Sequence, residues 1–83
     1  MKVHIRYFAS VREALGRADE ALDTQADTLA ALRDELIARG APYAAALARG
    51  KAVRMALDQV MSPESAALRE GAEVAFFPPV TGG

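Results

Sequence analysis

The segment that decides how the fold must end is residues 73–83, Glu73-Val74-Ala75-Phe76-Phe77-Pro78-Pro79-Val80-Thr81-Gly82-Gly83. Residues 73–77 are mostly apolar and β-prone, which predicts a strand. Pro78 and Pro79 have no backbone N–H to donate to a sheet, so the strand must end before them. The two glycines after them cap no helix and complete no turn. They form a thin lead to the α-carboxylate, which indicates that this carboxylate is the working group.

The tail offers an uncrowded carboxylate on a stiff base. Two consecutive prolines favour an extended rod, which would hold the tip away from the domain and reduce the entropy lost on capture by a partner. No Cβ crowds the carbonyl of Gly83, and Gly82 adds freedom to enter a narrow slot. A free carboxylate is inert towards sulfur and nitrogen nucleophiles. It must first be activated as a mixed anhydride, for example as an acyl-adenylate.

The composition is that of one small globular domain. The chain has 83 residues, of which 52% are hydrophobic and 25% charged, and this length allows a single core. The net charge is -1 and the cations are scattered, so nucleic acid is not expected as a partner. No apolar run has the length of a membrane span, and the alternating N-terminus does not resemble a signal peptide. We therefore expect no membrane partner and a cytoplasmic location.

Side chains that could carry chemistry are scarce. The chain has no cysteine, which excludes a disulfide, a thiolate metal site and a cysteine nucleophile. His4 is the only histidine and has no companion ligand, so no metal site is expected. The sequence contains no recognisable nucleophile–base pair or phosphate-binding glycine loop. Three basic residues are interpreted as solvated surface charges: Arg6, Arg12 and Lys51. The sequence leaves open that a few basic residues pair with acidic groups on a partner.

The N-terminal part predicts a strand, a short helix and a weak strand. Residues 2–8 alternate, with three apolar side chains on one face: Val3, Ile5 and Tyr7. Ser10 and Glu13 fit a capping box, with Ser10 as the N-cap of a short helix. Gly16 suits the left-handed position after that helix. Residues 17–24 are interpreted as a short edge strand.

The main helix is predicted over residues 28–39, capped by Asp27 or Thr28. Its apolar stripe consists of three leucines at helical spacing: Leu29, Leu32 and Leu36. Glu35 and Arg39 have the spacing and order of an i,i+4 ion pair on the solvent side.

The remaining segments predict a second short helix and a group of strands. Pro42 suits the first position of a helix over residues 42–48. Val53, Met55 and Leu57 alternate with less bulky or charged residues, which predicts a strand. Residues 58–59 are expected to form a tight turn into a returning strand at 60–61. The order of elements predicts an α+β domain in which one main helix packs on a mixed sheet.

The segment 73–83 resembles the C-terminal signature of molybdopterin synthase sulfur-carrier subunits, which belong to the MoaD/ThiS family of ubiquitin-like proteins. Residues 7–13, Tyr7-Phe8-Ala9-Ser10-Val11-Arg12-Glu13, are similar to the first strand and helix of that family. The resemblance implies a ubiquitin-like β-grasp fold. It also implies a β-grasp domain over residues 1–78 and a flexible diglycine tail over 79–83.

The resemblance further implies a function and two partners. A MoeB-like adenylating enzyme would use ATP to activate Gly83, which would then be converted to a thiocarboxylate. The tail would enter a MoaE-like large subunit and donate sulfur to cyclic pyranopterin monophosphate, and two small subunits on a dimer of large ones would form a heterotetramer. The residues implied in tail insertion are Pro79, Val80, Thr81 and Gly82. Phe77 and Pro78 would dock on the partners, and the chain itself would bind no cofactor or metal.

The residues leave other functions open. The same activated carboxylate could form an isopeptide bond with a lysine, as ubiquitin-like modifiers do. Thiazole-synthesis sulfur carriers also end in diglycine, although they lack the Phe-Pro-Pro lead. A third alternative is a domain that only docks, through the last strand and Phe77. Phe76 and Phe77 point to opposite faces of that strand, so one is expected in the core.

Overall fold

The centre of the fold is the pairing of the first strand with the last. In the computed structural model, which describes residues 1–79, β1 (Lys2–Tyr7) runs parallel to β5 (Glu73–Phe77). On the outer side of β1 lies β2 (Asp19–Asp23), paired antiparallel. On the outer side of β5 lies β3 (Arg54–Leu57), also antiparallel.

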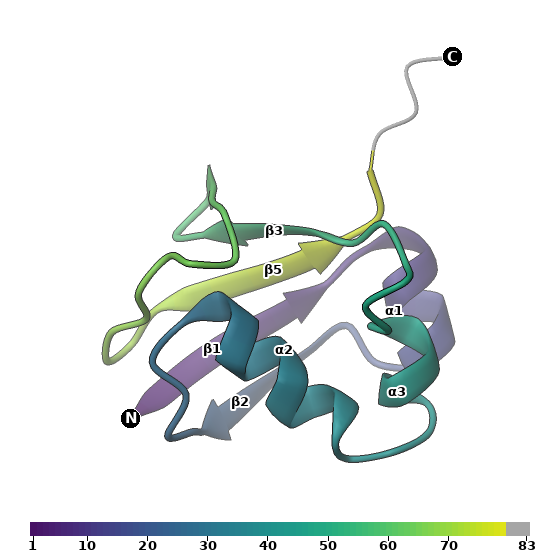
Figure 1. The fold of residues 1–83 in the computed structure, drawn as a ribbon, viewed down its shortest axis with the longest axis horizontal. Helices are drawn as coiled ribbons and strands as arrows, with labels where there is room; N and C mark the ends of the chain where they lie inside the picture. The colour runs from purple at the N-terminus through teal and green to yellow at the C-terminus, as the bar shows by residue number, and fades with distance from the viewer. Residues whose placement is uncertain (80–83) are drawn as a thin grey trace.

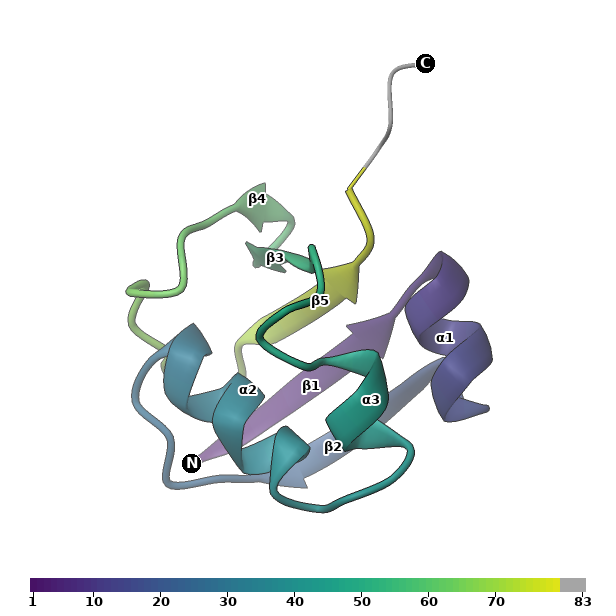
Figure 2. The same cartoon turned by 45° about the vertical axis from the view of Figure 1, so that its right-hand side comes forward.

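The hairpin partner of β3 is β4 (Val60–Met61), which completes a five-stranded mixed sheet of order β2-β1-β5-β3-β4. Figure 1 shows this sheet with α2 (Leu29–Ile37) crossing one face and α3 (Tyr43–Ala46) beside it. Figure 2 shows α1 (Ala9–Leu15) at the end of β1, on the side where the chain leaves β5. The predicted α+β architecture, a mixed sheet with one main helix, is confirmed.

The core fills the space between α2 and the sheet. The alternation of β1 is as predicted, because Val3, Ile5 and Tyr7 are at most 1% exposed while their neighbours face solvent. The leucine stripe of α2 is also confirmed, with each of its three members fully buried: Leu29, Leu32 and Leu36. From β5, Val74 and Phe76 enter the same core. The helix therefore sits on one face only and leaves the other face of the sheet open.

The capping box predicted at Ser10 is wrong. Helix α1 begins two residues earlier than that cap implies, at Ala9, and its N-cap is Phe8, which makes no side-chain capping bond. The chain turns sharply at Ala9 (φ 51°), so Ser10 already lies inside the first turn and cannot reach the free amides there. The helix ends as predicted, since Gly16 adopts the left-handed conformation and donates its N–H to the Arg12 carbonyl at 2.9 Å.

The ion pair predicted between Glu35 and Arg39 is also wrong. Helix α2 ends at Ile37, two residues before Arg39, so the i,i+4 geometry is not maintained. Glu35 instead accepts a hydrogen bond from the hydroxyl of Thr24, and Arg39 turns to Glu20, 2.9 Å away. The start of the helix is as expected, because the Thr28 hydroxyl accepts from the Ala31 N–H at 3.1 Å.

Glu20 joins three parts of the chain at the edge of the core. One carboxylate oxygen accepts from the hydroxyls of Tyr7 and Tyr43, each at 2.8 Å, and the other from Arg39 at 2.9 Å. Burial raises the pKa of Glu20, but the hydrogen bonds from Arg39 and the two tyrosines outweigh it and hold the pKa below its usual value. Burial and the bond to Glu20 raise the pKa of Tyr7 well above its usual range. The carboxylate thus stays ionised while tying β1 and β2 to α3.

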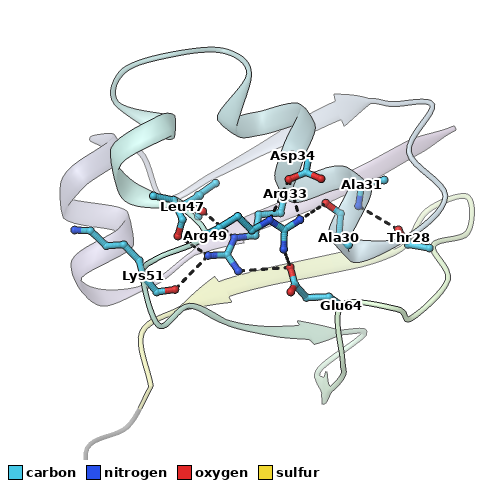
Figure 3. A network of polar contacts seen from close by, with 10 residues as sticks. Thr28, Ala30, Ala31, Arg33, Asp34, Leu47, Arg49, Lys51 and Glu64 are labelled. Carbon is cyan, nitrogen blue, oxygen red and sulfur yellow. Dashed lines mark hydrogen bonds and ion pairs between the residues drawn. The ribbon is translucent and has the colours of Figure 1, made fainter.

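A second polar cluster, drawn in Figure 3, holds the loop between α3 and β3. Arg33 on α2 is only 4% exposed. It donates to the carbonyls of Leu47, Ala48 and Lys51 at 2.8, 2.7 and 3.2 Å. These bonds fix the course of the chain just before β3, a segment without regular structure. Sequence reasoning had not singled out Arg33.

Arg49 extends this cluster towards solvent. Its guanidinium lies 2.8 Å from the Asp34 carboxylate and also pairs with Glu64, which in turn is 3.5 Å from Arg33. The loop after β4 is thereby tied to α2. Across residues 1–79, every buried side-chain nitrogen and oxygen has a hydrogen-bond partner. No helix in this part of the chain is long and apolar enough to cross a membrane.

Replacing Arg33 with Met should lower the free energy of unfolding by about 3 kcal/mol, because the loop carbonyls lose their buried donors. Urea denaturation at pH 7 measures this change. Arg49→Met is the matched control: its side chain is 43% exposed, so a loss of about 1 kcal/mol is expected. Equal losses in the two variants would contradict the assignment of Arg33 as the principal support of the loop.

Glu20→Gln should lower the free energy of unfolding at pH 7 by about 2 kcal/mol, since charge-assisted hydrogen bonds are lost. The folded-state pKa of Glu20 lies below its unfolded value. Its contribution is therefore complete above the unfolded pKa and is lost as the pH falls through the folded pKa. Denaturation curves between pH 7 and acid should show the gap between wild type and variant narrowing. Glu13→Gln, at an exposed position, is the control, and a gap that widens in acid would refute this account.

Candidate functional site

The base of the tail lies at the end of β5, opposite the N-terminus of the chain (Figure 1). Phe77 is the last strand residue, and Pro78 and Pro79 follow it, partly buried. The strand ends before the prolines, as predicted. The positions expected to insert and react beyond Pro79, namely Val80, Thr81, Gly82 and Gly83, lie outside the described residues, and their roles stay predictions.

Pro78 borders a hollow of about 240 Å³ beside the tail base. Its other lining residues come from α1, from α3 and from the chain before β3: Ser10, Val11, Ala14, Ala46, Lys51, Ala52 and Val53. The loop that Arg33 holds therefore forms one wall next to the tail.

The two phenylalanines of β5 have different environments, as their alternation predicts. Phe76 is fully buried and stacks on Tyr7, with ring centroids 6.2 Å apart. Phe77 points to the opposite face of the sheet and is partly exposed. One phenylalanine thus anchors the strand in the core, and the other lies on the face that no helix covers.

We call this uncovered surface near the tail the open face. Strand pairing defines it, because Arg6, Ala75, Ala56 and Met61 stand opposite one another across β1, β5, β3 and β4. In the next row, Phe77 pairs with Arg54. The side chains on β1, β5 and β3 point away from α2, since their neighbours along each strand face the core, and Met61 shares their face because it pairs with Ala56.

The middle of the open face is apolar and its margin is exposed. Ala56 and Ala75 are each 8% exposed and form the centre. Phe8 and Met61 are 40% and 60% exposed at the two sides. Phe8 lies on this face because its ring packs under the Arg6 guanidinium, 5.4 Å from the ring centroid. Exposed large apolar side chains around an apolar centre are typical of a protein-binding surface.

Sequence reasoning named Phe77 but missed Phe8 and Met61. Phe8 could have been found, because it stands two residues after Arg6 on the same face of an alternating strand. Met61 could not, because its position depends on the register between β3 and β4. That register is set by the turn at Asp58 and Gln59, which are both left-handed (φ 51° and 68°), a geometry typical of two-residue hairpins.

Asp58 holds this turn in place. Its carboxylate accepts from the Glu73 N–H at 2.9 Å and from Arg69 at 2.8 Å. The backbone bond to Glu73 and the bond to Arg69 lower the pKa of Asp58. Because Glu73 begins β5, the same carboxylate fixes the hairpin relative to the strand that carries the tail.

Residues 1–79 contain no group of three His, Cys, Asp or Glu side chains placed to hold a metal ion. His4 lies 3.8 Å from Asp19 on the surface, with both side chains more than half exposed. The described site consists of an apolar face with basic residues beside the end of β5.

A mixed sheet with one main helix and a C-terminal strand leading into a tail defines a small protein of the ubiquitin-like β-grasp class. The family model of the ThiS family matches residues 5–83. The chain therefore belongs to the ThiS family.

Two curated relatives span almost the whole chain. The molybdopterin synthase sulfur carrier subunit of Escherichia coli (strain K12) is 41% identical over 83 residues, covering 98% of this chain and 99% of its own. The protein of the same name from Haemophilus influenzae is 38% identical over 81 residues, with the same coverage.

Solved structures confirm the fold. SAMP1 from Haloferax volcanii is similar with a TM-score of 0.77 at 24% identity, over 100% of both chains. A chain from the protein–protein complex of subunits 1 and 2 of molybdopterin-converting factor from Helicobacter pylori matches with a TM-score of 0.66 at 23% identity, also over 100% of both.

The two adjacent phenylalanines allow the stability contribution of a core residue to be compared with that of a residue on the open face. Phe76→Ala should lower the free energy of unfolding by about 4 kcal/mol, because it opens a cavity beside Tyr7. Phe77→Ala, the matched variant on the opposite face, should cost about 1 kcal/mol. Urea denaturation of both variants measures the difference. Similar losses would mean that Phe77 is a second core residue and would remove it from the open face.

Proposed function

We propose that this chain is a sulfur carrier for molybdopterin synthesis, in which the domain 1–78 presents the tail 79–83 and the carboxylate of Gly83 is the reacting group. One observation carries the proposal. The strand β5 brings an apolar face suited to protein binding and the base of a diglycine tail to the same end of the sheet. Full-length relatives at 41% and 38% identity that bear the sulfur-carrier name support it.

The chemistry begins with activation by a partner. An oxygen of the Gly83 carboxylate attacks the α-phosphate of ATP on a MoeB-like adenylating enzyme, and pyrophosphate leaves. A sulfur nucleophile at the oxidation level of sulfide then attacks the acyl carbon. The bond between this carbon and the AMP oxygen breaks, and AMP leaves. The product is a C-terminal thiocarboxylate. The absence of a Cβ on Gly83 leaves both faces of the acyl carbon accessible.

Sulfur transfer takes place on a second partner, a MoaE-like large subunit. In the proposed complex the open face docks through Phe77, Pro78 and the neighbouring Phe8 and Met61. Pro79, Val80, Thr81 and Gly82 then extend into the large subunit. There the thiocarboxylate sulfur is delivered to cyclic pyranopterin monophosphate, and two transfers build the dithiolene. The complex of subunits 1 and 2 from Helicobacter pylori supports a partner of this kind.

The side chains of this chain indicate which groups its partners must supply. The described residues carry docking groups and structural ion pairs, so catalytic side chains are assigned to the partners and ATP to the activating enzyme. Both partners use the same tail, which means that they bind in turn. Two small subunits on a dimer of large ones give the heterotetramer that the family resemblance implies.

Incubating the full chain with ATP, its cognate adenylating enzyme and a sulfide source should replace one oxygen of the C-terminal peptide by sulfur. Intact-mass and peptide mass spectrometry measure this gain. A variant that lacks Gly82 and Gly83 is the control. It should keep the wild-type unfolding curve and show no gain.

Two results would contradict the proposal. One is an unchanged C-terminal mass after incubation with a cognate adenylating enzyme whose activity has been verified. The other is the appearance of Gly83-dependent conjugates to lysine in cell extract without any thiocarboxylate, which would favour a protein modifier.

A further inference from the structure

Two arginines on the open face differ from most of the others in this chain. Five arginines lie within 4 Å of a carboxylate and stabilise the fold: Arg17, Arg33, Arg39, Arg49 and Arg69. Arg6 and Arg54 make no such pair with any of residues 1–79, and both are exposed. They belong to neighbouring rows of the open face, with Arg6 on β1 and Arg54 on β3.

The positions of these two guanidinium groups are set by the sheet. Arg6 stands opposite Ala75 on one side of β5, and Arg54 stands opposite Phe77 on the other side. The apolar centre therefore lies between two positive charges. Arg6 is further oriented by the ring of Phe8, since a cation above an aromatic face is attracted to it.

No carboxylate of residues 1–79 lies within 4 Å of either guanidinium. Asp19 stands opposite Arg6 across β1 and β2, but the contact its carboxylate makes is to His4, at 3.8 Å. Glu73 lies on the same face two residues before Ala75, opposite His4 and towards the far end of β5. With Arg6 and Arg54 against Asp19, the end of the open face nearest the tail keeps an excess of positive charge, although the chain as a whole has a net charge of -1.

We propose that the open face recognises an acidic surface on the large subunit. Two carboxylates of that surface meet Arg6 and Arg54, and an apolar patch of the large subunit between them covers Ala75, Phe77 and Met61. This inference rests on the sulfur-carrier function and adds the chemistry of the partner. A guanidinium binds a carboxylate through two parallel hydrogen bonds, which gives direction as well as attraction. The apolar centre favours a protein over a nucleic acid, because phosphates would pair with the arginines and leave Met61 and Phe8 uncovered.

The arrangement predicts which step of binding the charges control. Charges at the margin of an interface mainly raise the association rate, and salt screens them. The apolar centre determines how long the complex lasts. Association should therefore depend on ionic strength, with Arg6 and Arg54 carrying most of that dependence.

The test measures association and dissociation rates of the full chain with its cognate large subunit by surface plasmon resonance, over a range of salt concentrations. The double variant Arg6→Glu with Arg54→Glu should associate about 10-fold more slowly at low salt. Its association rate should also fall less with added salt than that of wild type. Lys2→Glu is the matched control, because Lys2 lies on the same face of β1 at the opposite end. It should behave as wild type, and thermal melts should show that all variants fold.

A complementary exchange sharpens the test. Replacing acidic residues on the large subunit by arginine should slow association with wild type and restore it with the double variant. Association that is independent of salt and unchanged in the double variant would overturn the acidic-partner inference. In that case, thiocarboxylate formation on Gly83 would still support the sulfur-carrier proposal. Failure of the wild type both to bind the large subunit and to gain sulfur would overturn the two together.

Discussion

The parallel pairing of β1 with β5 is the constraint on which the rest of the molecule depends. It is the one parallel pair among the described strands, and it places the first and last segments of the chain at the centre of the sheet. A parallel pair needs a long crossover, and residues 8–72 supply it with all three helices and the other strands. Because β5 is held by β1 on one side and β3 on the other, its end is fixed. The position of the tail base is set by the end of β5.

Polar clusters stabilise the parts of the crossover that regular structure does not. Glu20 gathers Tyr7, Tyr43 and Arg39 where β2 meets the helical layer, and Arg33 collects the carbonyls of the loop before β3. Both clusters place a charge in a partly or fully buried setting and surround it with hydrogen bonds. Such an arrangement is stable only when each lone pair and proton is matched. The loops near the tail are therefore held by specific geometry as well as by apolar packing.

The sequence allowed prediction of whatever depends on local periodicity. The alternation of Val3, Ile5 and Tyr7 and the stripe of Leu29, Leu32 and Leu36 identified the core, because burial of apolar surface follows the period of each element. Predictions of polar pairing at Ser10 and between Glu35 and Arg39 failed, since helix ends moved by a residue or two and better partners came from distant parts of the chain. The same limit applies to the open face. Phe77 could be named from the strand pattern, whereas Met61, Arg6 and Arg54 acquire their relation to it only through strand register, which no single sequence displays.

The last strand also limits how deep a partner's reaction site can lie. Phe76 is locked in the core and Phe77 sits on the open face, so the start of the tail cannot slide outward. Gly83 is the sixth residue after Phe77, and a fully extended chain of six residues spans about 20 Å. On the proposed function, an acyl carbon carried by Gly83 can react only within that radius of the docking surface. Inserting one residue into β5 would not extend this reach without exchanging the core and docking faces, so tail length and docking geometry must change together.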